Sequence, residues 1–362
     1  MEHALDGPSR RSVLKYGLGG LATVIAGGTS ILATTRSAAA DVVGGTLFVS
    51  RGERTMIDGL VVPVVGFGST STRVELPGPQ IEVQPGDTVN LTITNTANVP
   101  VGFSVPGVAG AELAPLAPGT TRTLTFTAPS KPGTLYYVGT VSGSADTGRA
   151  LGATGALVVH PSGARGDIAA MYPGVHTRAK RQPMFGTMTP PAMPVTVTRQ
   201  RTWLFSELNP TTVRDLAGGR VALPDDPEPE YFLINGISGM LSVEDQQTKL
   251  EGKAGGLGQL GDAYLLRMIN TGRAPRSIHM HGNHFWVLTH PDTPWIVGAH
   301  KDTITVPSGT TVDVLVPFEA PPDAWPVVRQ GQKYVVHDHI EMAETASGGH
   351  YPAGMISALL FE

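Results

Sequence analysis

The sequence predicts an all-β protein made of two β-sandwich domains. Its 362 residues include 45 Gly and 30 Pro, which favour turns over long helices. Short runs of alternating apolar and polar residues recur between turn signals, and no long stretch has the period of an amphipathic helix. The segments PGDTVNLTITNT (85–96) and LGDAYLLRMINTG (260–272) look like the same strand in each half. We therefore expect one sandwich repeated twice.

The first forty residues have the order of an export signal. Arg10 and Arg11 form a twin-arginine pair, an apolar Gly/Ala-rich run follows at 16–35, and small residues end the segment at 38–40. The run is too short and too rich in Gly for a convincing membrane span. We expect a twin-arginine signal peptide over 1–40, a periplasmic or extracellular destination, and no membrane span after cleavage. The alternative is a chance basic start on a cytoplasmic protein.

Domain 1 is expected at 43–160, where candidate strands lie at 80–96, 120–129, 133–141 and 155–160. Residues 161–197 are Pro-rich and aperiodic, which indicates a linker over the surface. Domain 2 is expected at 198–362. Its candidate strands lie at 231–236, 263–270, 284–288, 302–318, 333–339 and 356–362.

Charge and cysteine content exclude several classes of function. The formal net charge is −4, and no basic-aromatic patch or polybasic stretch points to nucleic acid or to a membrane surface. The chain contains no Cys. It therefore has no disulfides and no thiolate metal site, which excludes blue copper.

The eleven histidines are placed unevenly, with none between Asp41 and Val159. Two His-x-His pairs stand in domain 2. Side chains at i and i+2 of a strand share a face, so two neighbouring strands could bring four imidazoles together. Such a set suits copper, with zinc as the alternative metal. The predicted metal ligands are His279, His281, His337 and His339. The competing interpretation is a relic, hydrogen-bonded in a core that holds no metal.

At these histidines the chain resembles a known family. RSIHMHGNHFWVL (276–288) is similar to the HPxHLHGHxF signature of multicopper oxidases, the laccase-like cupredoxin proteins. HDHI (337–340) and HYPAGM (350–355) are similar to the closing HCHIxxHxxxGM. The resemblance implies two cupredoxin-like Greek-key β-sandwich domains and copper as cofactor. The two-domain length is similar to that of small laccases and copper nitrite reductases, which implies a homotrimer.

The chain departs from the family pattern in both copper sites. Ser104, Pro106, Val138 and Thr140 stand where domain 1 of the family supplies histidines to the oxygen-reducing cluster. The type 1 positions hold Arg276, Asp338, His350 and Met355, and His350 follows His339 by eleven residues against four in the family motif. We predict that Arg276 and Asp338 form a buried salt bridge in the lost type 1 site. The alternative is that both face solvent.

We expect most of the other candidate residues to have structural roles. His284 is expected beside the site or at the surface, with ligation as a less favoured alternative, and His350 and Met355 are expected to be structural. Phe285 and Trp286 are expected in the core. The loop histidines are expected to be His160, His176, His290 and His300. A further alternative makes Asp338 or Glu341 a general base beside a metal-bound water.

Two functional hypotheses follow from different classes. The first is an exported oxidoreductase with a mononuclear or dinuclear copper centre that acts on a small-molecule substrate or oxygen. The second is a non-catalytic cupredoxin-fold scaffold or copper-binding protein of the cell envelope. Retention of both His-x-His pairs favours the first hypothesis. Loss of the other ligands favours the second.

Overall fold

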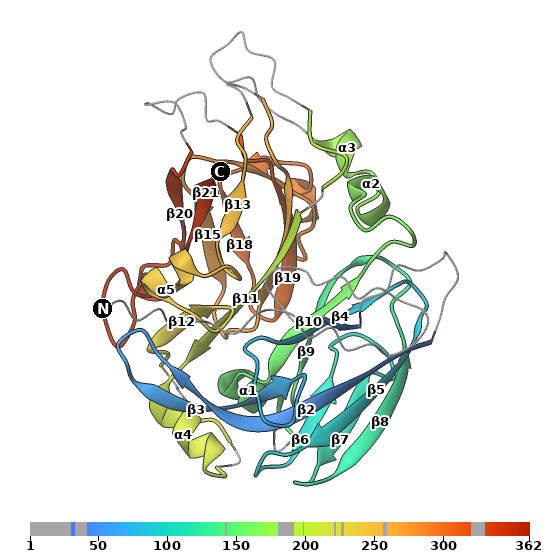
Figure 1. The fold of residues 1–362 in the computed structure, drawn as a ribbon, viewed down its shortest axis with the longest axis vertical. Helices are drawn as coiled ribbons and strands as arrows, with labels where there is room; N and C mark the ends of the chain where they lie inside the picture. The colour runs from blue at the N-terminus through green and yellow to red at the C-terminus, as the bar shows by residue number, and fades with distance from the viewer. Residues whose placement is uncertain are drawn as a thin grey trace, which may run out of the picture.

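A computed structural model describes residues 30–32, 42–141, 143–179, 192–197, 199–220, 222–225, 228–255, 259–319 and 330–362. The predicted signal peptide lies outside these residues except for the short strand β1 (Ser30–Leu32). The described residues fold mainly as strands, arranged in four sheets, and the all-β prediction is confirmed (Figure 1).

The first half of the chain forms two sheets that face each other. Strand β5 shows why, since Val89, Leu91 and Ile93 alternate with polar residues and are fully buried on one face. One sheet has the order β3 (Val61–Gly68), β2 (Val42–Thr55), β5 (Thr88–Asn95), β8 (Thr121–Thr127). The other has the order β1, β4 (Gly78–Val83), β10 (Thr154–Val159), β9 (Gly133–Val138), β6 (Val101–Ser104), β7 (Glu112–Leu116).

The second half forms a further pair of sheets around a core that includes Trp203, Phe205 and Phe285. The larger sheet has the order β12 (Tyr231–Ile234), β11 (Arg199–Leu208), β14 (Tyr264–Asn270), β19 (Thr310–Val316), β16 (Phe285–Val287), β17 (His300–Lys301). The smaller has the order β13 (Leu250–Gly252), β21 (Ile356–Phe361), β20 (Lys333–Asp338), β15 (Arg276–Met280), β18 (Thr303–Val306).

The strands predicted to repeat occupy equivalent places. β5 pairs parallel with β2 and antiparallel with β8. β14 pairs parallel with β11 and antiparallel with β19 in the same way. The two halves therefore build their sheets with the same local topology, as the repeated segments predicted. The residue numbers of the domain boundaries stay a prediction.

The described helices are short and lie in the connections between strands. They are α1 (Ala145–Leu151), α2 (Ile168–Met171), α3 (Val175–Arg178), α4 (Pro210–Ala217), α5 (Gly239–Glu244) and the 3-10 turns η1 (Pro294–Ile296) and η2 (Glu341–Glu344). Asn209 caps α4, because its side chain accepts a hydrogen bond from the Thr212 amide at 2.9 Å. Within the part of the chain that the structure describes, no helix is long and apolar enough to cross a membrane.

The described part of the predicted linker packs closely against the second half. Ile168, Met171 and Val175 join Trp286 and Leu315 of the larger sheet in one buried cluster. Below this cluster a polar network joins both halves and the linker, since Asp313 of β19 accepts hydrogen bonds from Thr134 of β9 at 2.9 Å and from Tyr172 at 2.7 Å. Apolar packing and buried hydrogen bonds therefore fix the linker against the sheet.

A cluster of charged residues surrounds the buried Glu82 at the end of β4. Glu82 accepts a hydrogen bond from Arg165 at 2.6 Å, and His160 Nε2 lies 3.5 Å from the same carboxylate. His160 is only 2% exposed. His160 follows β10 directly and lies in a loop as expected, but the fold encloses its side chain.

Candidate metal centre

The two His-x-His pairs stand on neighbouring strands. β15 and β20 are antiparallel, with His279 opposite His337 and Ile278 opposite Asp338 (Figure 1). Along β15 the side chains alternate between the core and the outer face, so Ile278 and Met280 are buried while His279 is half-buried outside. Strand periodicity therefore places the imidazoles on one outer face of this sheet.

Three of the four imidazoles converge. One ring nitrogen from each of His279, His281 and His337 lies within 4.8 Å of the other two. The closest pair is His281 Nε2 and His337 Nε2, 3.1 Å apart. The ring of His339 lies 5.5 Å from that of His279 and 5.4 Å from that of His337, between centroids. The geometry brings three of the predicted ligands together and leaves His339 at the border.

The spacing of the closest pair fits two ligands of one metal ion. Metal–imidazole bonds of about 2.0 Å in a tetrahedral site hold two ligand nitrogens about 3.3 Å apart. The 3.1 Å between His281 and His337 is close to that value. It also fits a hydrogen bond between two neutral rings, which is the geometry that a metal-free relic would have. His281 is exposed, so solvent or a small molecule can approach the centre.

Hydrogen bonds at Nδ1 orient the rings of His279 and His337. His279 Nδ1 is hydrogen-bonded to Thr303 Oγ1 at 2.8 Å and lies 4.0 Å from Asp302 Oδ2. His337 donates from Nδ1 to the carboxylate of Glu344. With Nδ1 occupied, both rings offer Nε2 to a metal. Burial, with the neighbouring imidazoles, lowers the pKa of His279 and His281, although Asp302 opposes the shift at His279. Lower pKa values favour the neutral rings that ligate metals.

The family's type 1 position holds a buried ion pair. Arg276 Nη1 lies 3.6 Å from Asp338 Oδ2, and the two residues are 1% and 0% exposed. The predicted salt bridge is confirmed and the solvent-facing alternative is wrong, but the contact is single rather than bidentate. The sequence did not indicate the second partner: Arg276 Nη2 donates to Glu207 of β11, and the guanidinium lies 5.0 Å from the Phe232 ring centroid.

Asp338 has a structural role in this arrangement. Its Oδ1 accepts hydrogen bonds from the amides of Ser277 at 2.9 Å and Ile340 at 3.1 Å. Burial raises its pKa, against the opposing effect of these bonds and of Arg276. Adjacent strand residues point to opposite faces, so Asp338 faces away from His337. Asp338 as a general base at the histidines is therefore wrong. Glu344 is the glutamate that contacts them, whereas no such contact of Glu341 is present in the described chain.

The other histidines lie apart from the centre. His284 stacks on His300 with ring centroids 5.0 Å apart, and His300 is hydrogen-bonded to Glu319 at 3.2 Å. His300 lies in β17 and His176 in α3, so the expectation of loop positions is wrong for both. Phe285 and Trp286 are buried as predicted. Of the type 1 positions, Met355 is fully buried and His350 is exposed.

The first half of the chain has matching strands without the ligands. Ser104 of β6 pairs directly with Val138 of β9, and Gly102 and Thr140 exchange backbone hydrogen bonds of 3.0 and 3.2 Å. The four positions assigned to the lost ligands thus belong to neighbouring segments, as the resemblance implied. None of their side chains is an imidazole, so this half offers no counterpart to the C-terminal histidines.

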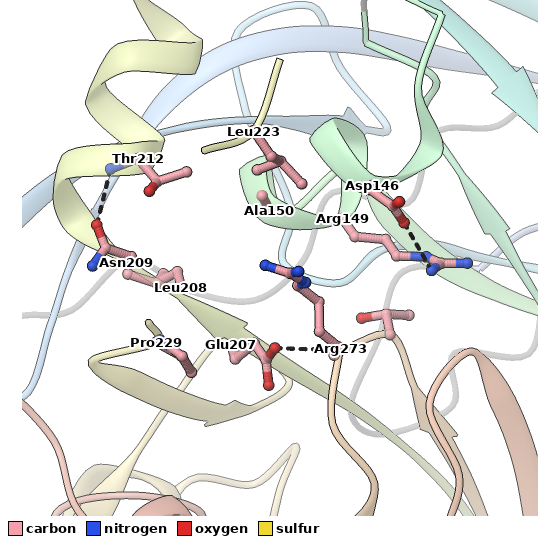
Figure 2. Close-up of a pocket in the computed structure, with 12 residues that line it drawn as sticks. Asp146, Arg149, Ala150, Glu207, Leu208, Asn209, Thr212, Leu223, Pro229 and Arg273 are labelled. Carbon is pink, nitrogen blue, oxygen red and sulfur yellow. Dashed lines mark hydrogen bonds and ion pairs between the residues drawn. The ribbon is translucent and has the colours of Figure 1, made fainter. Parts of the chain in front are cut away.

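A cleft lies beside Glu207, the second partner of Arg276. Glu207 lies in its wall, and its carboxylate accepts a hydrogen bond from the Arg273 amide at 2.8 Å (Figure 2). The other carboxylate oxygen accepts a hydrogen bond from Arg276. Arg149 of α1 lines the opposite side and pairs with Asp146 at 3.2 Å. The carboxylate that lines the cleft is therefore already engaged on both oxygens.

Comparisons with known proteins agree with the resemblance seen at the histidines. Two models described as multicopper oxidase match residues 70–164 and 243–348, over half of the chain together. Laccase-20 of Oryza sativa subsp. japonica is 26% identical over 266 residues and 68% of this chain. Laccase-13 of Arabidopsis thaliana is 27% identical over 270 residues and 70% of this chain. The chain spans about two fifths of the length of these laccases, 39% and 41%.

Solved structures share the fold. A multicopper oxidase, mgLAC, aligns with a TM-score of 0.64 at 22% identity, over 89% of this chain and 87% of its own. The blue copper oxidase of Nitrosomonas europaea aligns with a TM-score of 0.61 at 18% identity, over 89% and 85%. The copper nitrite reductase of Nitrosomonas europaea aligns with a TM-score of 0.56 at 18% identity, over 89% and 93%.

Proposed function

This chain belongs to the multicopper oxidase family, and on that premise we propose that it is an exported copper oxidoreductase. Its copper centre is smaller than that of the family and is mononuclear or dinuclear. The proposed ligands are His279, His281 and His337, with His339 at the border. The observation that carries the proposal is the convergence of three imidazole nitrogens within 4.8 Å on neighbouring strands. Neutral imidazoles at this spacing are a donor set that suits copper, and zinc is the alternative.

Copper bound there would supply one-electron redox chemistry. The chain lacks the family's electron relay, because it has no Cys and the type 1 position holds Arg276 and Asp338. A substrate must therefore meet the histidine centre itself. The exposed edge at His281 leaves room for oxygen or a small reductant, while Thr303 and Glu344 keep the ligating rings in place.

The proposal is tested by the metal content of the exported protein. Elemental analysis with an electron paramagnetic resonance (EPR) spectrum should find at least one copper per chain with a non-blue signal. The double variant His281→Ala, His337→Ala should lose copper uptake. His350→Ala is the matched control, because this histidine is exposed and occupies a family ligand position outside the centre. Metal-free protein that takes up no copper on titration would contradict the proposal, and zinc in place of copper would assign the other metal.

A second candidate is a non-catalytic copper-binding or scaffold protein of the cell envelope. It is favoured by the loss of all four first-domain ligand positions and by the ion pair that fills the type 1 site. The two candidates differ in turnover. Copper-loaded protein should consume oxygen with a small reductant if it is an oxidoreductase, and consumption no faster than in the double variant would favour the scaffold.

Export is proposed from the twin-arginine sequence at Arg10 and Arg11. Replacement of both arginines by lysine should retain the precursor inside the cell, because this pair is the feature that the export route reads. Cell fractionation measures the result. Unchanged export of the Lys-Lys variant would contradict this part of the proposal.

A further inference from the structure

We propose that Glu344 is a positioning residue of the histidine centre, supplied by a segment that the family motif lacks. It holds His337 with Nε2 turned towards His281. This inference rests on the proposed copper function. In the family motif, the histidine that aligns with His350 follows the one that aligns with His339 by four residues. In this chain His350 follows His339 by eleven residues. Glu344 lies within that longer connection.

The contact is direct and shielded. The Glu344 carboxylate accepts the hydrogen bond of His337 Nδ1, and the two side chains are 15% and 16% exposed. A proton held on Nδ1 leaves the lone pair on Nε2, which is the atom 3.1 Å from His281 Nε2. Glu344 therefore favours the tautomer that can ligate a metal and fixes the orientation of the ring, beside the longer contact of 3.2 Å that the Asp338 carbonyl makes with the same Nδ1.

The fold ties both ends of the segment that carries Glu344. At its start, Asp338 Oδ1 accepts a hydrogen bond from the Ile340 amide at 3.1 Å. At its end, the amide of Gly354 donates to the Glu344 carbonyl at 3.0 Å and that of Met355 to the Ala343 carbonyl at 2.8 Å. Asp338 occupies the position of the family's cysteine, so the converted residue now helps to anchor the turn that positions Glu344.

The four histidines differ in the side chains that are hydrogen-bonded to their rings. His279 has a neutral partner in Thr303, and His337 has an anionic one in Glu344. Among the described residues, His281 and His339 have no comparable hydrogen bond to a hydroxyl or a carboxylate. Glu344 thus places a carboxylate on the far side of His337, where it fixes the ring without itself occupying a ligand position.

A variant series separates orientation from charge. Glu344→Ala removes both and should weaken copper binding 10- to 100-fold, on the order found for such outer partners. Glu344→Gln keeps an acceptor for Nδ1 without the charge and should fall between Ala and wild type. Glu341→Ala is the matched control: it removes a glutamate from the same short helix, but an exposed one. Its affinity should equal that of wild type, and thermal unfolding of each metal-free variant checks folding.

A metal-free measurement keeps this inference distinct from the copper function. Nitrogen-15 NMR of the imidazoles should show His337 as the Nδ1–H tautomer in wild type and a mixture of tautomers in Glu344→Ala. If wild type takes up no copper, the proposed function fails and the tautomer alone decides the role of Glu344. An unchanged tautomer in Glu344→Ala, or an unchanged copper affinity where wild type binds copper, would overturn the assignment.

Discussion

Arg276 and its partners show how charged side chains can occupy a position where the family has metal ligands. Two carboxylates, Glu207 and Asp338, share one guanidinium, and all three residues are buried or nearly so. A pair of buried charges contributes little net stability, but removal of one partner leaves the others without compensation. The consequence depends on which member is removed.

Replacement of Arg276 should be more costly than replacement of Asp338. Arg276→Met strands two buried carboxylates and should lower the free energy of unfolding by about 3–5 kcal/mol. Asp338→Ala leaves Arg276 paired with Glu207 and should cost about 1–3 kcal/mol, for two amides that lose their acceptor. Urea unfolding of metal-free protein measures both values. A harmless Arg276→Met, or the reverse order, would contradict this description of the pair.

Glu82 makes stability depend on pH in the acid range. Burial alone would raise its pKa, but hydrogen bonding and charge interactions with His160 and Arg165 hold the pKa at about 2, below the ordinary 4.5. The lowered pKa means that the folded state binds this proton less tightly than the unfolded state. The stabilisation, about 3 kcal/mol, is therefore complete above pH 4.5 and is lost as pH falls towards 2.

The Glu82→Gln variant tests this dependence. It should be less stable than wild type at neutral pH, and its stability should change less between pH 4.5 and 2. Chemical unfolding at several pH values measures the difference. Parallel pH curves for wild type and variant would show that Glu82 does not titrate in this way.

At the scale of an element, the turn after β15 decides where His281 lies. Gly282 has φ +66°, and a Cβ there would stand 2.4 Å from the Tyr334 ring. The turn therefore needs a glycine, because neither the backbone nor the space admits a side chain. Tyr334 and His281 are held on either side of this turn.

Gly282→Ala should therefore weaken copper binding as well as stability. The displaced turn would move His281, and a shift of about 1 Å in a ligand is enough to spoil a metal site. Gly331→Ala is the matched control, since its φ is +82° with nothing within 4 Å. It should cost about 1–2 kcal/mol of stability from the left-handed backbone and leave copper affinity unchanged. Equal copper affinities for the two variants would show that the turn at Gly282 does not position His281 for copper binding.

The elements also show what could be predicted from the sequence. Clean alternation predicted β5, and the His-x-His spacing predicted the histidine face of β15 and β20. Strand β2 was missed because glycines and charged residues interrupt its apolar pattern. Glu207 was missed because it lies 69 residues from Arg276. Glu344 was missed because its segment has no counterpart in the family motif.

For the whole molecule, the resemblance to two-domain relatives predicts a homotrimer. The histidine face is open to solvent at His281 and His339 in the single chain. Light scattering after size exclusion should give about three times the mass of one processed chain. The mass of a single chain would refute the trimer and leave the copper proposal in place, because the three converging imidazoles all come from one chain.

The proposed copper centre requires three imidazoles to share one ion. Pulsed EPR of protein loaded with one equivalent of Cu²⁺ tests this most directly, because it detects the remote nitrogen of each bound imidazole. We expect couplings from at least three imidazoles in wild type, and one fewer in each of His279→Ala, His281→Ala and His337→Ala. Bound copper whose imidazole couplings are unchanged by all three substitutions would contradict the account.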